Sequence, residues 1–201
     1  MVVSDSFNHK ENRLALEWEW NHNPEEGCWS FTERPGYLRL RTQSLARDIM
    51  TARNTLTQRT IGPKCTFTVE LETQGMKVGD YAGLAAFQSN YGTVGVKVES
   101  DNSRKLVVCK KGSDGQQSEE ESVLLESDKV FLKVAFDFED GRDIAEFFYS
   151  ADGRDWRRIG RELHMLYTLD LFTGYRIGIY CFARKETGGY ADFRRFSFEM
   201  C

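Results

Sequence analysis

A short segment near the start of the chain combines the side chains that sugar recognition requires. Trp20-Asn21-His22-Asn23-Pro24 follows a strand-like run, and Trp29 lies a few residues further on. An aromatic ring stacks on the apolar face of a pyranose, while amide and imidazole groups bond its hydroxyls. We therefore predict sugar contacts from Trp20, Asn21 and His22. The competing interpretation is that Trp20 closes the core and the polar run after it forms a turn.

A second unusual segment, Arg53 to Arg59, has the length of a strand but is polar on both faces. A strand on the concave face of a sandwich, where it lines a groove, would have this composition. An exposed edge strand is the alternative, because edges tolerate polar residues. The next strand, Asp80 to Gln88, carries small residues that leave room above it. The side chains predicted to line this groove are Asn54, Gln58, Arg59, Tyr81, Gln88 and Tyr91.

Catalytic patterns are not found. A jelly-roll glycosidase presents its acids along one strand as Glu-x-Asp-x-x-Glu, and the chain has no such run. The acids of Asp137-Phe138-Glu139-Asp140 lie at a strand end beside a glycine turn, where solvated carboxylates are ordinary. The three histidines, His9, His22 and His164, are far apart, and no Ser or Cys lies in a nucleophile-elbow setting. We predict that the chain is not an enzyme by itself.

A structural calcium ion is a further hypothesis. Asp192 begins the last strand-like segment, and a carboxylate there can ligate calcium together with backbone carbonyl groups. Asp5 lies near Asp192 if the two ends of the chain pair. The alternative is that these carboxylates only make capping hydrogen bonds.

The elements that must position these side chains are strands. Apolar and polar residues alternate along Cys65–Leu71, Val94–Val98 and Val130–Phe138, and again along Leu16, Trp18 and Trp20. Such alternation is typical of strands with one buried face. Turn residues such as Arg34-Pro35-Gly36 separate the runs at short intervals. The pattern predicts an all-β, two-sheet jelly-roll sandwich, with residues 1–201 as a single domain.

Four other segments have local interpretations. The polar stretch Lys111–Glu121 is predicted to be a solvated loop, with an acidic partner site as the weaker alternative. Leu45–Ala52 and Glu162–Leu169 are predicted to form short helical turns. Ser150–Trp156 has the Asp-Gly turn of a β-hairpin. Of the five widely spaced cysteines, those in apolar strands are predicted to pack in the core; they are Cys65, Cys109 and Cys181.

Composition excludes several classes of partner. The formal charge is -4 and the basic residues are scattered, which argues against nucleic acid. The longest apolar runs have strand length and carry charges, so we expect no membrane span. The first residues lack the pattern of an export signal. We therefore expect either a cytoplasmic protein or a domain cut from a longer bacterial enzyme.

Taken in order, the segments resemble the C-terminal concanavalin A-like domain of glycoside hydrolase family 43, the β-xylosidase and α-arabinofuranosidase family. The resemblance covers nearly the whole chain. It is carried by Trp18–Pro24, Trp29 with Thr32–Leu40, Asn54–Thr60, Tyr81–Leu84, Phe172–Gly174 and Ala191–Phe193. Arg194-Arg195 departs from the family, in which an Asp followed by an aromatic residue is common there, and this argues against a metal ligand on the last strand.

The resemblance implies a non-catalytic accessory sandwich that follows a glycosidase propeller. It implies that Phe172 lines the substrate pocket of that propeller, and that the ligand is xylan, arabinoxylan or a xylo-oligosaccharide. The first hypothesis is therefore a carbohydrate-binding domain. The second is a purely structural domain that stabilises the propeller and lines its pocket without binding sugar independently. A third, a catalytic jelly-roll hydrolase or lyase, lacks the required carboxylate motif.

Overall fold

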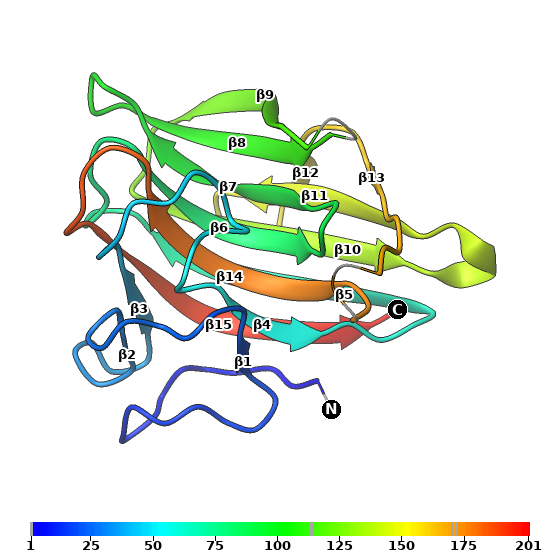
Figure 1. Ribbon diagram of the computed structural model, residues 1–201, viewed down its shortest axis with the longest axis horizontal. Coiled ribbons are helices and arrows are strands. Elements are labelled where there is room, and N and C mark those ends of the chain that lie inside the picture. Colours follow the sequence, from blue (N-terminus) through cyan, green and yellow to red (C-terminus); the bar gives the residue numbers. More distant parts are fainter. Residues whose placement is uncertain (1, 113–114, 170, 172) are drawn as a thin grey trace.

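Two antiparallel β-sheets pack face to face in the computed structural model, which describes residues 2–112, 115–169, 171 and 173–201 (Figure 1). Every strand pair within the sheets is antiparallel. The seven-stranded sheet runs in the order β1 (Glu19–Trp20), β4 (Leu56–Arg59), β14 (Arg176–Ala183), β6 (Asp80–Phe87), β7 (Gly92–Val98), β8 (Arg104–Lys111) and β9 (Gln117–Leu125).

The second sheet has eight strands. Its order is β12 (Arg157–Arg158), β11 (Ile144–Ser150), β10 (Lys129–Asp137), β5 (Lys64–Glu72), β15 (Tyr190–Met200), β3 (Leu38–Arg41) and β2 (Trp29–Ser30), and β13 (Leu163–His164) pairs with β11. The strands β6 to β9 and β10 to β12 follow one another in sequence, whereas pairs such as β4 with β14 and β5 with β15 join distant parts of the chain. The described residues contain one helical element, the 3₁₀ turn η1 (Glu139–Gly141).

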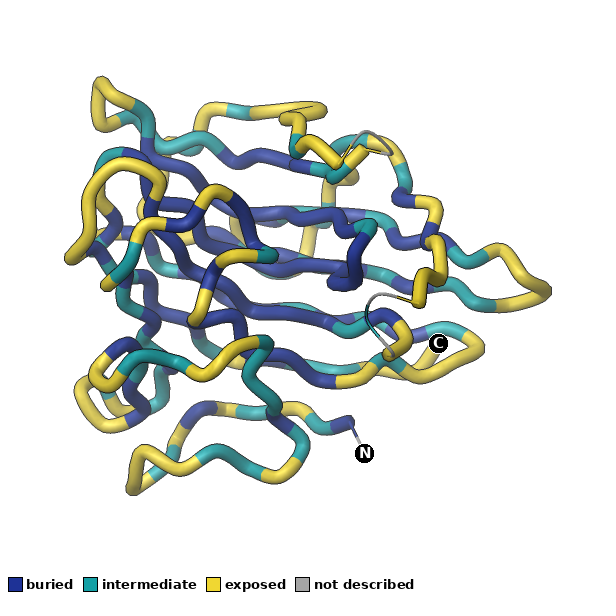
Figure 2. Tube along the Cα trace, viewed as in Figure 1, coloured by how far each residue is buried: buried dark blue, intermediate teal, exposed yellow. Residues whose placement is uncertain are grey.

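The main core lies between the sheets and follows the alternation of the strands. Leu84 and Val94 of the seven-stranded sheet and Phe67 and Val134 of the eight-stranded sheet are wholly buried in one cluster. The next residues along each strand point away from this core. Figure 2 shows the resulting contrast between buried strands and exposed turns. The sequence prediction of a two-sheet, all-β sandwich is confirmed.

A second, smaller core covers the outer face of the seven-stranded sheet. The segment 45–53, called here the covering segment, crosses this face (Figure 1). Its apolar residue Ile49 is wholly buried with Ala46 and Ala52 in a cluster that includes Tyr180 of β14 and Tyr91 of the turn after β6. The covering segment makes one hydrogen-bonded turn, in which the Ala52 amide donates to the Asp48 carbonyl at 3.1 Å, and it forms no helix. Much of this face is therefore closed to solvent.

Several local predictions are confirmed. Alternating runs form β5, β7 and β10, and Ser150–Trp156 forms the turn between β11 and β12. Cys65, Cys109 and Cys181 are buried free thiols. Burial raises the pKa of the Cys65 and Cys109 thiols to about 11, which keeps both protonated at neutral pH.

Three local predictions are wrong. Leu16 is 97% exposed and lies outside the first strand, which spans only Glu19–Trp20, although Trp18 is buried. The stretch Lys111–Glu121 is not one loop, because Gln117–Leu125 forms β9, an exposed edge strand that carries three glutamates. Within Glu162–Leu169 the structure has the short strand β13 and no helical turn. Among the described residues no helix is long and apolar enough to cross a membrane.

Candidate functional site

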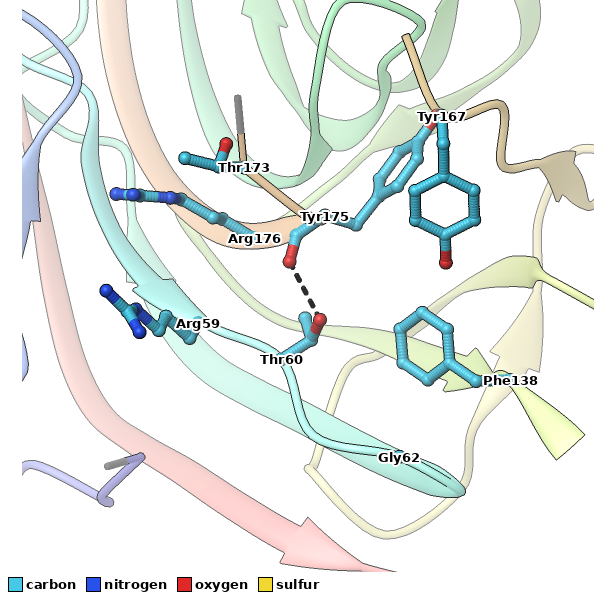
Figure 3. Close-up of a pocket in the computed structure, with 9 residues that line it drawn as sticks. Arg59, Thr60, Gly62, Phe138, Tyr167, Thr173, Tyr175 and Arg176 are labelled. Atoms are coloured by element: carbon cyan, nitrogen blue, oxygen red, sulfur yellow. Dashed lines mark hydrogen bonds between the residues drawn. The ribbon is translucent and has the colours of Figure 1, made fainter. Parts of the chain in front are cut away.

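An open cleft of about 470 Å³ lies at one end of the sandwich, where β4 leaves the seven-stranded sheet and β14 enters it (Figure 3). Three segments build it: the turn after β4, the end of β10, and the stretch that leads into β14. Its lining is formed by Arg59, Thr60, Gly62, Phe138, Tyr167, Thr173, Gly174, Tyr175 and Arg176. The cleft thus offers cations, hydroxyl groups and aromatic rings.

Hydrogen bonds fix the floor of the cleft. The Thr60 hydroxyl donates to the Tyr175 carbonyl at 2.8 Å and ties the turn after β4 to the start of β14. Tyr175 is buried, its hydroxyl donates to the Asn90 carbonyl, and the same oxygen accepts from the Leu166 amide at 3.2 Å. Burial raises the pKa of Tyr175. Tyr175 therefore acts as a neutral anchor that joins the turn after β4, the turn after β6 and the stretch that leads into β14.

Two rings form one side of the cleft. Tyr167 is 56% exposed and meets Tyr175 edge to face, with the ring centroids 6.0 Å apart. Its hydroxyl donates to Asp143 Oδ1 at 3.1 Å, and burial together with this carboxylate raises the pKa of Tyr167 to about 12. Phe138 stacks on Phe136, with the ring centroids 5.9 Å apart, and is only partly buried. Partly exposed rings of this kind are suited to stacking on a sugar.

Two arginines form the opposite side. Arg59 and Arg176 are direct cross-strand partners on β4 and β14, and Figure 3 shows both side chains projecting in the same direction. Arg176 Nη1 donates to a carboxylate oxygen of Glu19 and to the Thr57 hydroxyl at 3.3 Å. Arg59 has a 70% exposed side chain and only a 3.9 Å contact with Glu19.

The structure places the first predicted group at the end of β1 (Trp20) and in the loop after it (Asn21 and His22), and none of the three lines the cleft. The Trp20 ring packs against Trp29 at a centroid distance of 5.5 Å and is partly buried on the main core. The Asn21 amide donates to the Thr55 carbonyl at 2.9 Å. His22 is exposed and donates from Nε2 to the Met50 carbonyl at 2.8 Å, beside a shallow hollow. A sugar contact by these three residues stays a prediction.

The second predicted group does not form one groove. Asn54 is buried and donates to the Arg41 carbonyl at 2.6 Å, and Gln58 is buried and accepts from the Val3 amide at 3.0 Å. Tyr81 is stacked on Phe182 in the smaller core, and Tyr91 is buried there too. The covering segment thus fills the space that the small residues of β6 were predicted to leave above the sheet. Only Arg59 lines the cleft.

Gln88 has a positioning role next to the cleft. Its side-chain oxygen accepts from the Thr168 hydroxyl at 3.1 Å, and its amide donates to the Thr168 carbonyl at 3.4 Å and to the Leu171 carbonyl at 3.5 Å. Gln88 is itself buried, so it holds the stretch that leads into β14 against the end of β6. Phe172 lies outside the described residues.

The carboxylates predicted to bind calcium are engaged by protein donors. Asp192 is bound by Arg34 and Arg39, with Arg39 Nε donating to Oδ1 at 2.7 Å. Asp5 accepts from the Trp18 indole at 2.9 Å and from the Phe7 amide at 2.8 Å. Within the described part of the chain no three His, Cys, Asp or Glu side chains are grouped to hold a metal. Asp192 is thus held by ion pairs with arginines and Asp5 by hydrogen bonds, and calcium binding by either stays a prediction.

Most of the cleft was missed from the sequence. Phe138 was interpreted as the end of a core ladder, and Tyr167 was placed in a helical turn. The available signal was the run Met165-Leu166-Tyr167 followed by Leu169, in which apolar residues point to more than one face outside any long strand. Such a run cannot bury all its side chains in one sheet.

Residues 4–199 match the family model described as the β-xylosidase C-terminal concanavalin A-like domain. The chain is 26% identical to a β-xylosidase of Formosa agariphila over 93% of its own length and 33% of the relative's. It is 31% identical to a putative β-xylosidase of Xylanibacter ruminicola over 82% of its length and 28% of the relative's. The chain thus spans about a third of the length of these curated relatives.

Among solved structures, a bifunctional GH43-CE protein of Bacteroides eggerthii superposes with a TM-score of 0.91 at 45% identity. The match covers 98% of this chain and 27% of that protein. A β-glucanase of Bacillus licheniformis, at 12% identity and a TM-score of 0.60, shares the fold alone.

Proposed function

This chain belongs to the family of β-xylosidase C-terminal concanavalin A-like domains, and from that premise we propose that its end cleft docks against the catalytic part of a glycoside hydrolase and completes one wall of the substrate pocket. Members of the family are accessory domains of GH43 enzymes, so catalysis is not a property of this domain on its own. In this proposal residues 1–201 act as one sandwich domain beside a catalytic propeller.

The observation that carries the proposal is an apolar rim around the cleft. Ile61 is 36% exposed, Leu166 58% and Leu169 83%, and all three lie on the segments that build the cleft without lining it. Clustered exposed apolar residues of this kind mark contact surfaces. A catalytic domain that covers them would remove their apolar area from water.

The positions of the two chain ends also support docking of the catalytic part at the end of the sandwich that carries the cleft. The Val3 amide bonds to Gln58 on β4, and the Cys201 amide bonds to the Lys64 carbonyl at the start of β5, so both termini lie near the turn that borders the cleft (Figure 1). In the relatives the corresponding domain is C-terminal. A preceding catalytic part therefore connects to the end that carries the apolar rim.

The cleft itself provides the proposed substrate wall. Tyr167 and Phe138 supply rings, and Thr60 and Thr173 supply hydroxyl groups, which suits a xylan-type sugar. Independent sugar binding on the outer face of the seven-stranded sheet has less support, since the covering segment and buried side chains occupy that face.

Docking is tested by measuring whether the 201-residue chain binds a separate catalytic polypeptide that lacks its own copy of this domain. The Bacteroides eggerthii GH43-CE protein is shortened to remove the region matched by this chain, and its association with the 201-residue chain is followed by sedimentation velocity. We expect a one-to-one complex. Replacing Leu166 and Leu169 together by Ser should weaken the complex about tenfold or more, because two exposed apolar side chains are lost from the interface.

The matched control is Leu124→Ser. Leu124 is 61% exposed, but it lies on the edge strand β9 and not on the segments that build the cleft. Its replacement should leave the affinity unchanged. An absence of association, or equal weakening by both sets of substitutions, contradicts the docking proposal.

A further inference from the structure

Arg59 and Arg176 form a cationic pair with too little counter-charge. They are directly opposite on adjacent strands, an arrangement in which like charges repel. Both arginines pair with the same carboxylate, that of Glu19. The distance from Arg59 Nη2 to Glu19 Oε1 is as long as 3.9 Å. The acid next to the rings, Asp143, accepts from the Tyr167 hydroxyl. The arginine side of the cleft therefore carries an excess positive charge.

A mostly buried arginine of the same chain shows how a guanidinium group binds a carboxylate fully. Arg39 binds Asp192 through two nitrogens, at 2.7 and 2.8 Å, with a side chain that is only 16% exposed. This is the bidentate geometry in which a guanidinium group binds a carboxylate most strongly. Arg59 makes no comparable contact among the described residues, and its side chain is 70% exposed. Its guanidinium group is thus available to a carboxylate from outside.

The rest of the cleft limits what carries that carboxylate. Figure 3 shows the guanidinium groups at one side of the cleft and the rings of Tyr167 and Phe138 at the other, with Thr60 between them. A small inorganic anion would use only the arginine side. A sugar chain uses the rings by stacking and the hydroxyl groups by hydrogen bonding.

We infer that the cleft binds an oligosaccharide that carries a carboxylate, such as a xylan fragment with a uronic acid substituent. The carboxylate lies between Arg59 and Arg176, and a neighbouring pyranose stacks on Tyr167. This inference rests on the proposed function, in which the cleft forms a wall of the substrate pocket. It adds that the wall selects acidic over neutral chains.

The test compares two sugars on the 201-residue chain by isothermal titration calorimetry at low ionic strength. The probes are xylotriose bearing one glucuronic acid branch and plain xylotriose. We expect the acidic sugar to bind about tenfold tighter or more, and the difference to shrink in about 0.5 M salt because the charges are exposed. Equal affinity for both sugars, or no detectable binding of either, overturns the inference.

Substitutions at single residues test which side chain binds the carboxylate and which stacks on the sugar. Arg59→Gln should abolish the preference for the acidic sugar. Arg53→Gln is the matched control, since Arg53 has a 56% exposed side chain and lies away from the cleft lining. Tyr167→Ala should weaken both oligosaccharides while leaving free glucuronate unaffected, because only the stacking contact is lost. A preference that survives Arg59→Gln overturns the inference.

The outcomes separate this inference from the docking proposal. Loss of docking to the shortened GH43-CE protein, with a retained preference for the acidic sugar, rejects docking alone. Retained docking with no preference rejects the acidic-sugar site alone. If Arg59→Gln weakens docking and leaves both sugar affinities unchanged, the arginines bind a carboxylate of the protein partner, and the inference fails.

Discussion

Asp80 begins strand β6 with its side chain wholly buried. Its Oδ2 atom accepts from the Lys77 amide at 2.8 Å, whereas Oδ1 has no hydrogen-bond partner. Burial is the main cause that raises the pKa of this carboxyl group from 3.8 to about 6. The folded protein therefore binds a proton that the unfolded chain releases at lower pH.

This shift predicts the sign of a pH effect on stability. The stabilisation from the bound proton is fully present below pH 3.8 and is lost as the pH rises through about 6. A shift of about two units corresponds to a change of ~3 kcal/mol in the free energy of unfolding. Asp80→Asn cannot titrate there, so the stability of the variant relative to the parent should increase between pH 4 and pH 7. Urea unfolding at several pH values measures this difference.

Asp155→Asn is the control for the Asp80 experiment. Asp155 is exposed in the turn between β11 and β12, and its side chain makes no ion pair among the described contacts. Its replacement should not change stability between the two pH values by more than a few tenths of a kcal/mol. A pH-independent difference between Asp80→Asn and the parent would show that Asp80 is charged in the folded protein at low cost.

At the scale of elements, the strands were predictable wherever alternation was strict. Val130–Phe138 alternates because one face of β10 meets the core, and the register with β5 continues through the whole strand. Lys111–Glu121 misled the prediction because the first half of the edge strand β9 is polar and mostly exposed, and its Glu119 pairs with Lys97 instead of packing in a core. Leu45–Ala52 was predicted to form a helical turn, and its buried residues Ala46, Ile49 and Ala52 do have helical spacing, but that spacing does not show that the segment covers the sheet.

The covering segment gives a prediction about the smaller core. Ile49 is wholly buried and is the largest side chain that the segment places against the sheet. Ile49→Ala should lower the free energy of unfolding by about 2–5 kcal/mol, because it removes buried methyl groups and leaves a cavity. Leu45→Ala is the control, since Leu45 is 59% exposed and should cost little. Similar small losses in both variants would mean that the segment only lies loosely on the sheet.

At the scale of the whole molecule, the fold was accessible from the sequence and the cleft was not. Alternation is a pattern of neighbouring residues along one strand, so the burial of residues such as Phe67 and Val134 can be predicted from the local sequence. The cleft joins Thr60 to Tyr175, which are separated by more than half of the chain. Their contact depends on which strands are adjacent, and the pairing of β4 with β14 leaves no local pattern in the sequence.

The N-terminal stretch tests whether the sandwich and its flanking segments form one cooperative unit. Phe7 is wholly buried, with ring centroids 6.0 Å from Trp18 and 5.9 Å from Phe31, and it belongs to the main core between the sheets. Phe7→Ala should therefore lower the free energy of unfolding by about 3–5 kcal/mol while the transition stays single. Leu16→Ala, at a 97% exposed side chain of the same stretch, should cost almost nothing. Coincident fluorescence and circular dichroism transitions on heating measure both effects. A separate early transition in Phe7→Ala would show that the stretch folds on the sandwich without being part of its core.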